Sequence, residues 1–234
     1  MPMRRSSYFA SSIFRKQMVA ASGLVLVLFL LVHLGGNFLL FEGAARFNAY
    51  AASLQSLGGL LWAIRFALAA AAIVHVSFAV LLTVENRQAR DRGYAVRNTH
   101  GNTNFVRKTM IYSGSAVFLF LFLHLSDYAF GDRQGPGTVI AGVHGGESLG
   151  LFGLVWNSFR FAAHGWRPVV YILAVTCAGA HLTHGIQSIF QTFGFNHARY
   201  TPWIRRASIA LGIAVGTGFA LIPLLVNIIG TPRP

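Results

Sequence analysis

Five long runs of apolar residues, separated by polar and basic segments, dominate the pattern along the chain. Each run holds about the 20 residues that a helix needs to cross the hydrocarbon core of a bilayer. The first run is too long for the core of a signal peptide, so we interpret it as a spanning helix. The pattern predicts an all-α, polytopic membrane protein, one transmembrane domain over residues 1–234 with five helices in a bundle, at about 17–40, 61–84, 109–130, 167–190 and 204–229.

Two of the connecting segments also carry helical periodicity. In residues 41–60, apolar side chains from Phe47 to Leu54 recur at helical spacing, which predicts a short interfacial helix. The longest connection, residues 131–165, contains a stretch from Leu149 to Phe161 that we expect to form an amphipathic helix on the outer surface. The last apolar run has no histidine, and we expect it to pack at the edge of the bundle.

Composition supports a membrane domain and narrows the chemistry. Charged residues make up 11% of the chain, against about 25% in soluble domains. Cys177 is the single cysteine, so an internal disulfide is excluded, and an iron–sulfur cluster or a structural zinc site is not expected. We interpret Cys177 as a small buried residue.

The basic residues are unevenly distributed between the connections. Thirteen of the 19 Lys and Arg residues fall in the N-terminal segment and in residues 85–108 and 191–206. By the positive-inside rule these segments are cytoplasmic, so the N-terminus is cytoplasmic and the C-terminus is outside. Such a face suits anionic lipid or an acidic partner subunit. Nucleic acid is not expected, because the charges are dispersed and lack interleaved aromatic residues.

Histidines inside a bilayer are costly and usually functional, and four of the predicted helices carry one at a defined depth. The first and third helices both run outward. His33 follows Lys16 by 17 residues and His124 follows Lys108 by 16, which places both histidines about 25 Å along their helices. These two should share a level toward the outer face.

The second and fourth helices run inward and carry the other two histidines. His75 lies 12 residues before Arg87, and His181 lies 14 residues before Phe195, which places both in the cytoplasmic half, about 20 Å from those residues. The arithmetic therefore predicts two histidine pairs at two depths. Two opposed neutral imidazoles suit six-coordinate haem iron, so the sequence predicts two haems b, with these four histidines as iron ligands.

His184 competes with His181, because the two lie about one helical turn apart and only one can face the iron squarely. The other is left to hydrogen-bond a haem propionate or a quinone, or simply to pack. We expect the remaining histidines to be solvated: His100, His144, His164 and His197.

A short pattern occurs twice, in the first and the third helix. In both copies a basic pair is followed by a Ser-Gly dipeptide, and the histidine comes ten residues after the glycine, Gly23 or Gly114. Ten residues of helix span about 15 Å and return to nearly the same face. We interpret the glycines as giving room to a flat ligand held by the histidine of their own helix; helix packing is the alternative.

The basic pairs of the two copies lie where the propionates of the inner haem need donors. They are Arg15 with Lys16 and Arg107 with Lys108. The alternative is that these residues only anchor the topology.

These motifs resemble those of a known family. The chain is similar to the di-haem cytochrome b membrane anchors of succinate:quinone oxidoreductases (succinate dehydrogenase or fumarate reductase), of the single-subunit, five-helix type. In that family a glycine follows the fourth ligand by four residues, as Gly185 follows His181 here. The likeness covers nearly the whole chain in order, and is carried by His33-Leu34-Gly35-Gly36-Asn37, Phe47-Asn48, His75, Ser113-Gly114 with His124, and His181-Leu182-Thr183-His184-Gly185 running to Gly194.

The resemblance implies a subunit of respiratory complex II in a bacterial inner membrane, with a flavoprotein and an iron–sulfur subunit docked on its cytoplasmic face. Electrons would pass between succinate or fumarate, the clusters, the haems and a membrane quinone, often menaquinone. This subunit would hold haem and quinone but no dicarboxylate site. Some fumarate reductases of the family have a proton-transferring glutamate two residues before the fourth ligand. Gly179 stands there in this chain, so the sequence does not support that route.

The sequence leaves the quinone site and two other functions open. Polar candidates near a haem are Asn37, Glu42, Arg46, Asp127 and Tyr128 outside, and Ser12, Arg15 and His100 inside. One alternative function is another bis-histidine cytochrome b, but no helix carries two histidines at the two to four turns that such proteins use. The other is a haem-free transporter, which the scarcity of intramembrane acids disfavours.

Overall fold

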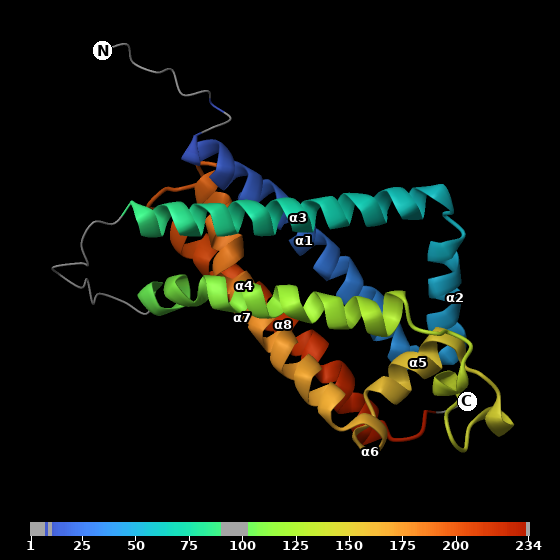
Figure 1. Cartoon of the computed structure of the whole chain (residues 1–234). Helices are drawn as coiled ribbons and strands as arrows, with labels where there is room; N and C mark the ends of the chain where they lie inside the picture. The colour runs from blue at the N-terminus through green and yellow to red at the C-terminus, as the bar shows by residue number, and fades with distance from the viewer. Residues whose placement is uncertain (1–7, 9–10, 90–102, 233–234) are drawn as a thin grey trace, which may run out of the picture.

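The computed structural model describes residue 8 and residues 11–89 and 103–232, and its architecture is all helical (Figure 1). In these ranges, five helices are long and apolar enough to cross a membrane, so the chain is a multi-pass membrane protein. The predicted spans are confirmed to within six residues at either end. They are α1 (Ser12–Phe38), α3 (Gly59–Gln88), α4 (Thr103–His124), α7 (Trp166–Thr192) and α8 (Thr201–Ile229).

Local chemistry sets several helix ends. The side chain of Ser11 caps α1 by accepting a 3.1 Å hydrogen bond from the backbone N–H of Phe14. At its other end α1 tightens into a 3₁₀ turn, η2 (Leu39–Glu42), and Gly43, with φ of +103°, turns the chain into α2 (Ala44–Gln55). The helix expected between the first two spans is therefore confirmed. Helix α4 continues into a π-helical turn, η3 (Leu125–Ala129).

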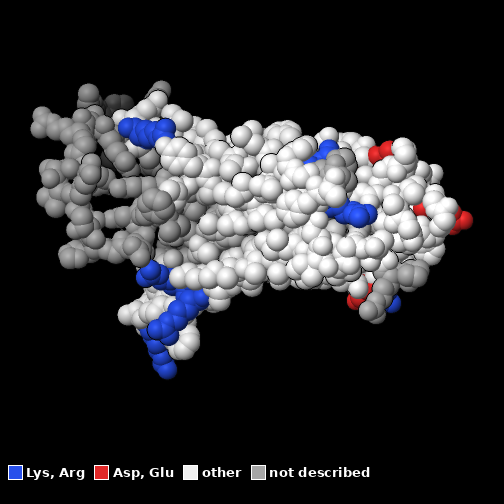
Figure 2. All heavy atoms as spheres, turned by 90° about the horizontal axis from the view of Figure 1, so that it is seen from below, with Lys and Arg blue, Asp and Glu red and all other residues white. Residues whose placement is uncertain are grey.

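The molecule has two chemically different ends, which we call the basic end and the cap end. The basic end holds the starts of α1, α4 and α8 and the last residues of α3 and α7 (Figure 1). The cap end holds α2 and the residues from 130 to 165. Figure 2 shows acidic side chains gathered toward the cap end, and Glu85 is the one acid that the described part of the basic end contains.

The spanning helices pack mainly in neighbouring pairs. Helix α1 packs along α3, α4 packs along α7, and α7 also packs against α8 over most of its length. Glycines make the last contact close: a Cβ built on Gly179 would lie 2.8 Å from the carbonyl oxygen of Gly212 and 2.9 Å from Cα of Gly216. Helix α8 thus has the packing role expected of it, whereas α3 contributes no buried residue to the fold.

The cap is a folded layer with a hydrophobic core. Its centre is α5 (Gly150–Ser158), which buries Phe152, Val155 and Trp156. A helix forms in the expected stretch, but it does not lie exposed on the surface: α5 is apolar on several sides and is covered by α2 and the connections around it. Asn48 of α2 fixes its start by donating to the carbonyl of Leu149 and accepting from the N–H of Phe152.

Short elements complete the cap. They are η4 (Pro136–Thr138), η5 (His144–Gly146) and α6 (Phe161–His164). The indole N–H of Trp156 donates to the carbonyl of Gly230, and the amide of Asn227 bonds to residues 159 and 161. The cap is thus tied to the end of α8.

Candidate functional site

Two pairs of histidine rings face one another inside the helical bundle. The cap-side pair is His33 of α1 with His124 of α4, and their ring centroids are 5.7 Å apart. The basic-side pair is His75 of α3 with His181 of α7, with centroids 6.5 Å apart. The rings of each pair are close to perpendicular, at 84° and 71°. The pairing expected from helix depth is confirmed.

The basic-side pair is held by hydrogen bonds from the neighbouring helices. Nδ1 of His75 lies 3.0 Å from the carbonyl oxygen of Val19, to which its N–H donates. Nδ1 of His181 lies 3.1 Å from Oγ of Ser113, whose own hydroxyl donates to the carbonyl of Met110. A proton held at Nδ1 leaves Nε2 with its lone pair, the form in which a histidine binds a metal.

The two repeated glycines lie against the rings of the basic-side pair. A Cβ built on Gly23 would lie 3.1 Å from Cε1 of His75, and one built on Gly114 would lie 3.1 Å from Cε1 of His181. The expectation that each glycine makes room for a ligand held by its own helix is therefore corrected. Ten residues of helix separate the glycine from that histidine by about 15 Å. The glycine therefore lies at the depth of the basic-side pair, where it contacts the histidine ring of the neighbouring helix.

The same contacts give the separation of the two levels. Gly23 touches the basic-side pair, and His33 on the same helix belongs to the cap-side pair. The rise of an α-helix over ten residues puts the pairs about 15 Å apart along the bundle.

The cap-side pair is surrounded by aromatic rings. His33 stacks on Phe29 at 5.1 Å and lies 5.8 Å from Phe219. Its ring nitrogens lie 3.4 Å from the amide nitrogen of Asn37, which donates more closely, at 2.7 Å, to the backbone carbonyl of His33. Nδ1 of His124 is buried and has no hydrogen-bond partner among the residues that the structure describes.

Beside His124 lies a buried polar cluster at the junction of bundle and cap. Arg167 forms a 3.0 Å ion pair with Asp127, whose side chain is 5% exposed, and the hydroxyl of Tyr171 donates to the same carboxylate at 2.9 Å. The rings of Tyr128 and Tyr171 lie 5.4 Å and 6.1 Å from the ring of His124. Asp127 and Tyr128 were expected near the outer histidines, whereas Arg167 and Tyr171 were not.

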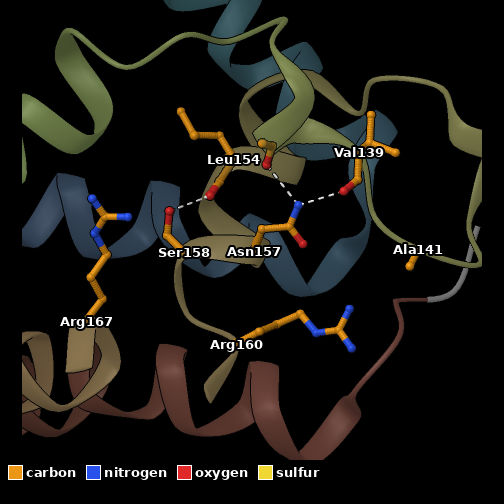
Figure 3. Close-up of a pocket in the computed structure, with 8 residues that line it drawn as sticks. Val139, Ala141, Leu154, Asn157, Ser158, Arg160 and Arg167 are labelled. Carbon is orange, nitrogen blue, oxygen red and sulfur yellow. Dashed lines mark hydrogen bonds between the residues drawn. The ribbon is translucent and has the colours of Figure 1, made fainter. Parts of the chain in front are cut away.

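A cavity of about 400 Å³ adjoins this cluster on its cap side. Arg167 and Ser158 belong to its wall, and Arg160 enters it from the other side (Figure 3). Asn157 stands between them and is held by two hydrogen bonds of 2.8 Å to the carbonyls of Gly137 and Val139. The cavity has mixed polar and apolar walls and is open to the surface.

The proposed propionate donors have different surroundings. Arg15 forms an ion pair with Glu85 of α3, so the structure gives it a protein partner that the sequence did not suggest. Lys16 is exposed. Arg107 and Lys108 lie in the first turns of α4, where side chains are outside the described part of the structure.

The other candidates separate into partly buried and peripheral residues. His184 is partly buried on α7, but the ring that faces His75 is that of His181. Glu42 and Arg46 pair with each other at 3.3 Å on the exposed surface of the cap end. Ser12 is exposed at the start of α1, and His144 and His197 are exposed, as expected. His100 lies outside the described residues, as does the side chain of His164.

The two pairs fit a haem iron on geometric grounds. Metal–nitrogen bonds of about 2 Å on both sides, plus roughly 1 Å from each nitrogen to its ring centre, give about 6 Å between centroids. Both pairs have about this separation. Within the described residues, no three His, Cys, Asp or Glu side chains gather as for a protein-only metal site. A ligand that brings four nitrogens of its own needs only the two axial imidazoles.

Comparison with family models, with curated proteins and with solved structures found no match to this chain.

Proposed function

We propose that this chain is the di-haem cytochrome b subunit that anchors a succinate:quinone oxidoreductase in a bacterial inner membrane. The observation that carries the proposal is the pair of histidine pairs, each drawn from two different spanning helices and about 15 Å apart along the bundle. The order of motifs along the chain, with its resemblance to that family, supports the same function.

In this function each bound haem supplies an iron that accepts and releases one electron. The chain holds the irons and fixes the axial ligands. Val19 and Ser113 keep His75 and His181 in the tautomer whose Nε2 is free to bind. With one histidine pair at each level, a bound haem would have no open site for oxygen, so it would carry electrons without activating oxygen.

The proposed orientation puts the basic end in the cytoplasm and the cap outside. Arg87, Arg199, Arg205 and Arg206 are exposed at the basic end, in keeping with the positive-inside rule. This end would receive the iron–sulfur subunit, with the flavoprotein beyond it. The basic-side pair would then be the first to exchange electrons with the clusters, and the cap-side pair the second. A membrane quinone completes the path.

An absorption spectrum and a haem assay of the purified complex test the proposal. We expect two low-spin haems b per chain, with the reduced alpha band of bis-histidine ligation. His33→Ala and His124→Ala should each remove one haem and leave the other, and His75→Ala and His181→Ala should do the same at the other level. A colourless wild-type protein, or one porphyrin per chain at most, would contradict the proposal.

A further inference from the structure

The buried polar atoms without partners lie in one place. In the described part of the chain they are Nδ1 of His124, the hydroxyl oxygen of Tyr128 and Nε of Arg167. Tyr128 follows His124 by one turn with ring centroids 5.4 Å apart, and Arg167 joins the same cluster through Asp127. Buried polar groups are nearly always hydrogen-bonded, so three atoms without a protein partner in one cluster indicate a bound water that joins them.

The basic-side pair has hydrogen-bond partners that His124 of the cap-side pair lacks. There, both Nδ1 atoms have a protein partner, Val19 or Ser113. The rings of two tyrosines lie beside His124, and the hydroxyl of Tyr171 already has a partner in Asp127, to which it donates. The hydroxyl of Tyr128 has no partner among the described residues, so its oxygen is open to accept the Nδ1–H of His124 through a bound water.

The backbone supports a special role for this turn. Residues 125–129 form the π-helical turn η3, which directly follows His124 and carries both Asp127 and Tyr128. Such turns occur often at functional sites, because the extra residue re-aims the side chains after it. Here the turn directs Asp127 to Arg167 and Tyr171, and leaves Tyr128 beside the histidine.

We propose that Tyr128 is the positioning residue of the cap-side haem ligand, and that its hydroxyl accepts the Nδ1–H of His124 through one bound water. The inference rests on the proposed function, which it deepens. A hydrogen bond at Nδ1 fixes the tautomer and makes the imidazole a stronger donor to the metal. A stronger donor stabilises the oxidised iron and lowers the midpoint potential of that haem alone.

Redox titration of the purified complex tests this, with haem content measured beside it. In Tyr128→Phe the midpoint potential of the cap-side haem should rise, and that of the basic-side haem should stay unchanged. His75→Ala, which keeps only the cap-side haem, identifies the signal that moves. Tyr112→Phe is the matched control, because Tyr112 is on the same helix and 68% exposed; it should move neither potential.

Tyr128→Gln separates the hydroxyl from the ring, because the amide oxygen can still accept a hydrogen bond. We expect it to keep the native potential more closely than Tyr128→Phe, and to keep the haem if Tyr128→Phe loses it. An unchanged potential in Tyr128→Phe would overturn the inference. So would equal shifts, or equal haem loss, in both variants, because the ring would then be what matters. Absence of haem from the wild-type complex would instead refute the proposed function.

Discussion

Gly114 lies directly against the ring of His181, so that a Cβ built on the glycine would come within 3.1 Å of Cε1. Gly23 has the same relation to His75. In both cases a helix that carries a cap-side histidine seats the basic-side histidine of the helix packed beside it. The repeated sequence pattern thus corresponds to a repeated two-helix unit, α1 with α3 and α4 with α7.

Replacing Gly114 with valine should displace the ring of His181 and remove the basic-side haem. The added side chain enters space that the ring occupies, and a packed interior does not yield to three more carbons without strain. We expect one haem per chain in place of two, by pyridine haemochrome assay. Gly35→Val is the control, because Gly35 has nothing within 4 Å of a built Cβ. Two retained haems in Gly114→Val would show that haem binding does not need the close contact between Gly114 and the ring of His181.

The two histidines of α7 should behave differently when replaced. His181 faces His75 across the bundle, so His181→Ala should abolish the basic-side haem. His184→Ala should leave two low-spin haems, seen in the reduced spectrum. A low-spin haem that survives at the basic side in His181→Ala would reverse the assignment.

Ser113→Ala should weaken the basic-side site without emptying the other. It removes the acceptor 3.1 Å from Nδ1 of His181, and loss of such an outer-shell partner costs about 10- to 100-fold in metal affinity. We expect the basic-side haem to transfer to an excess of a haem scavenger roughly tenfold faster or more. Ser115→Ala, an exposed position on the same helix, is the control. Equal transfer rates in both variants would contradict the role of Ser113.

Gly179→Leu should loosen the contact between α7 and α8. The side chain would meet the backbone of Gly212 and Gly216, and overpacking of this kind costs about 1–3 kcal/mol. We expect a lower free energy of unfolding in detergent, measured by denaturant titration. Ala180→Leu points an equal side chain to the exposed surface and should have little effect. Equal stability of the two variants would count against this close packing.

The spans and the depth of the histidines could be predicted because each depends on residues close together in the chain. Apolar runs of bilayer length define the helices, and the rise per residue then fixes how deep His33 or His75 lies. The four-histidine arrangement followed from that arithmetic and from alternating helix directions.

The rotation of each helix about its own axis, which decides the neighbour that each face meets, could not be predicted in the same way. Spacing put Gly23 and His33 on one face of α1, but which neighbour meets that face depends on tertiary packing. The rise over ten residues put each glycine about 15 Å from the histidine of its own helix, but the sequence did not show that a ring of another helix lies against it. The structure places them at the rings of α3 and α7.

The polar cluster at the cap was half predicted for a similar reason. Asp127 and Tyr128 follow His124 closely, so their nearness was visible in the sequence. Arg167 and Tyr171 are 40 and 44 residues from Asp127 in the chain, and only the fold brings them to it. Their spacing of four residues at the start of an apolar run was the available signal, because it puts both on one helix face.

Each histidine pair takes one ring from the α1–α3 unit and one from the α4–α7 unit, and α3 has no fully buried residue. On the proposed function, each haem would therefore link the α1–α3 unit to the α4–α7 unit. Chains that lack haem would then be less stable and more readily degraded by membrane proteases, so haem supply would set the amount of the protein. Biogenesis of the whole complex would follow the cell's capacity to make haem.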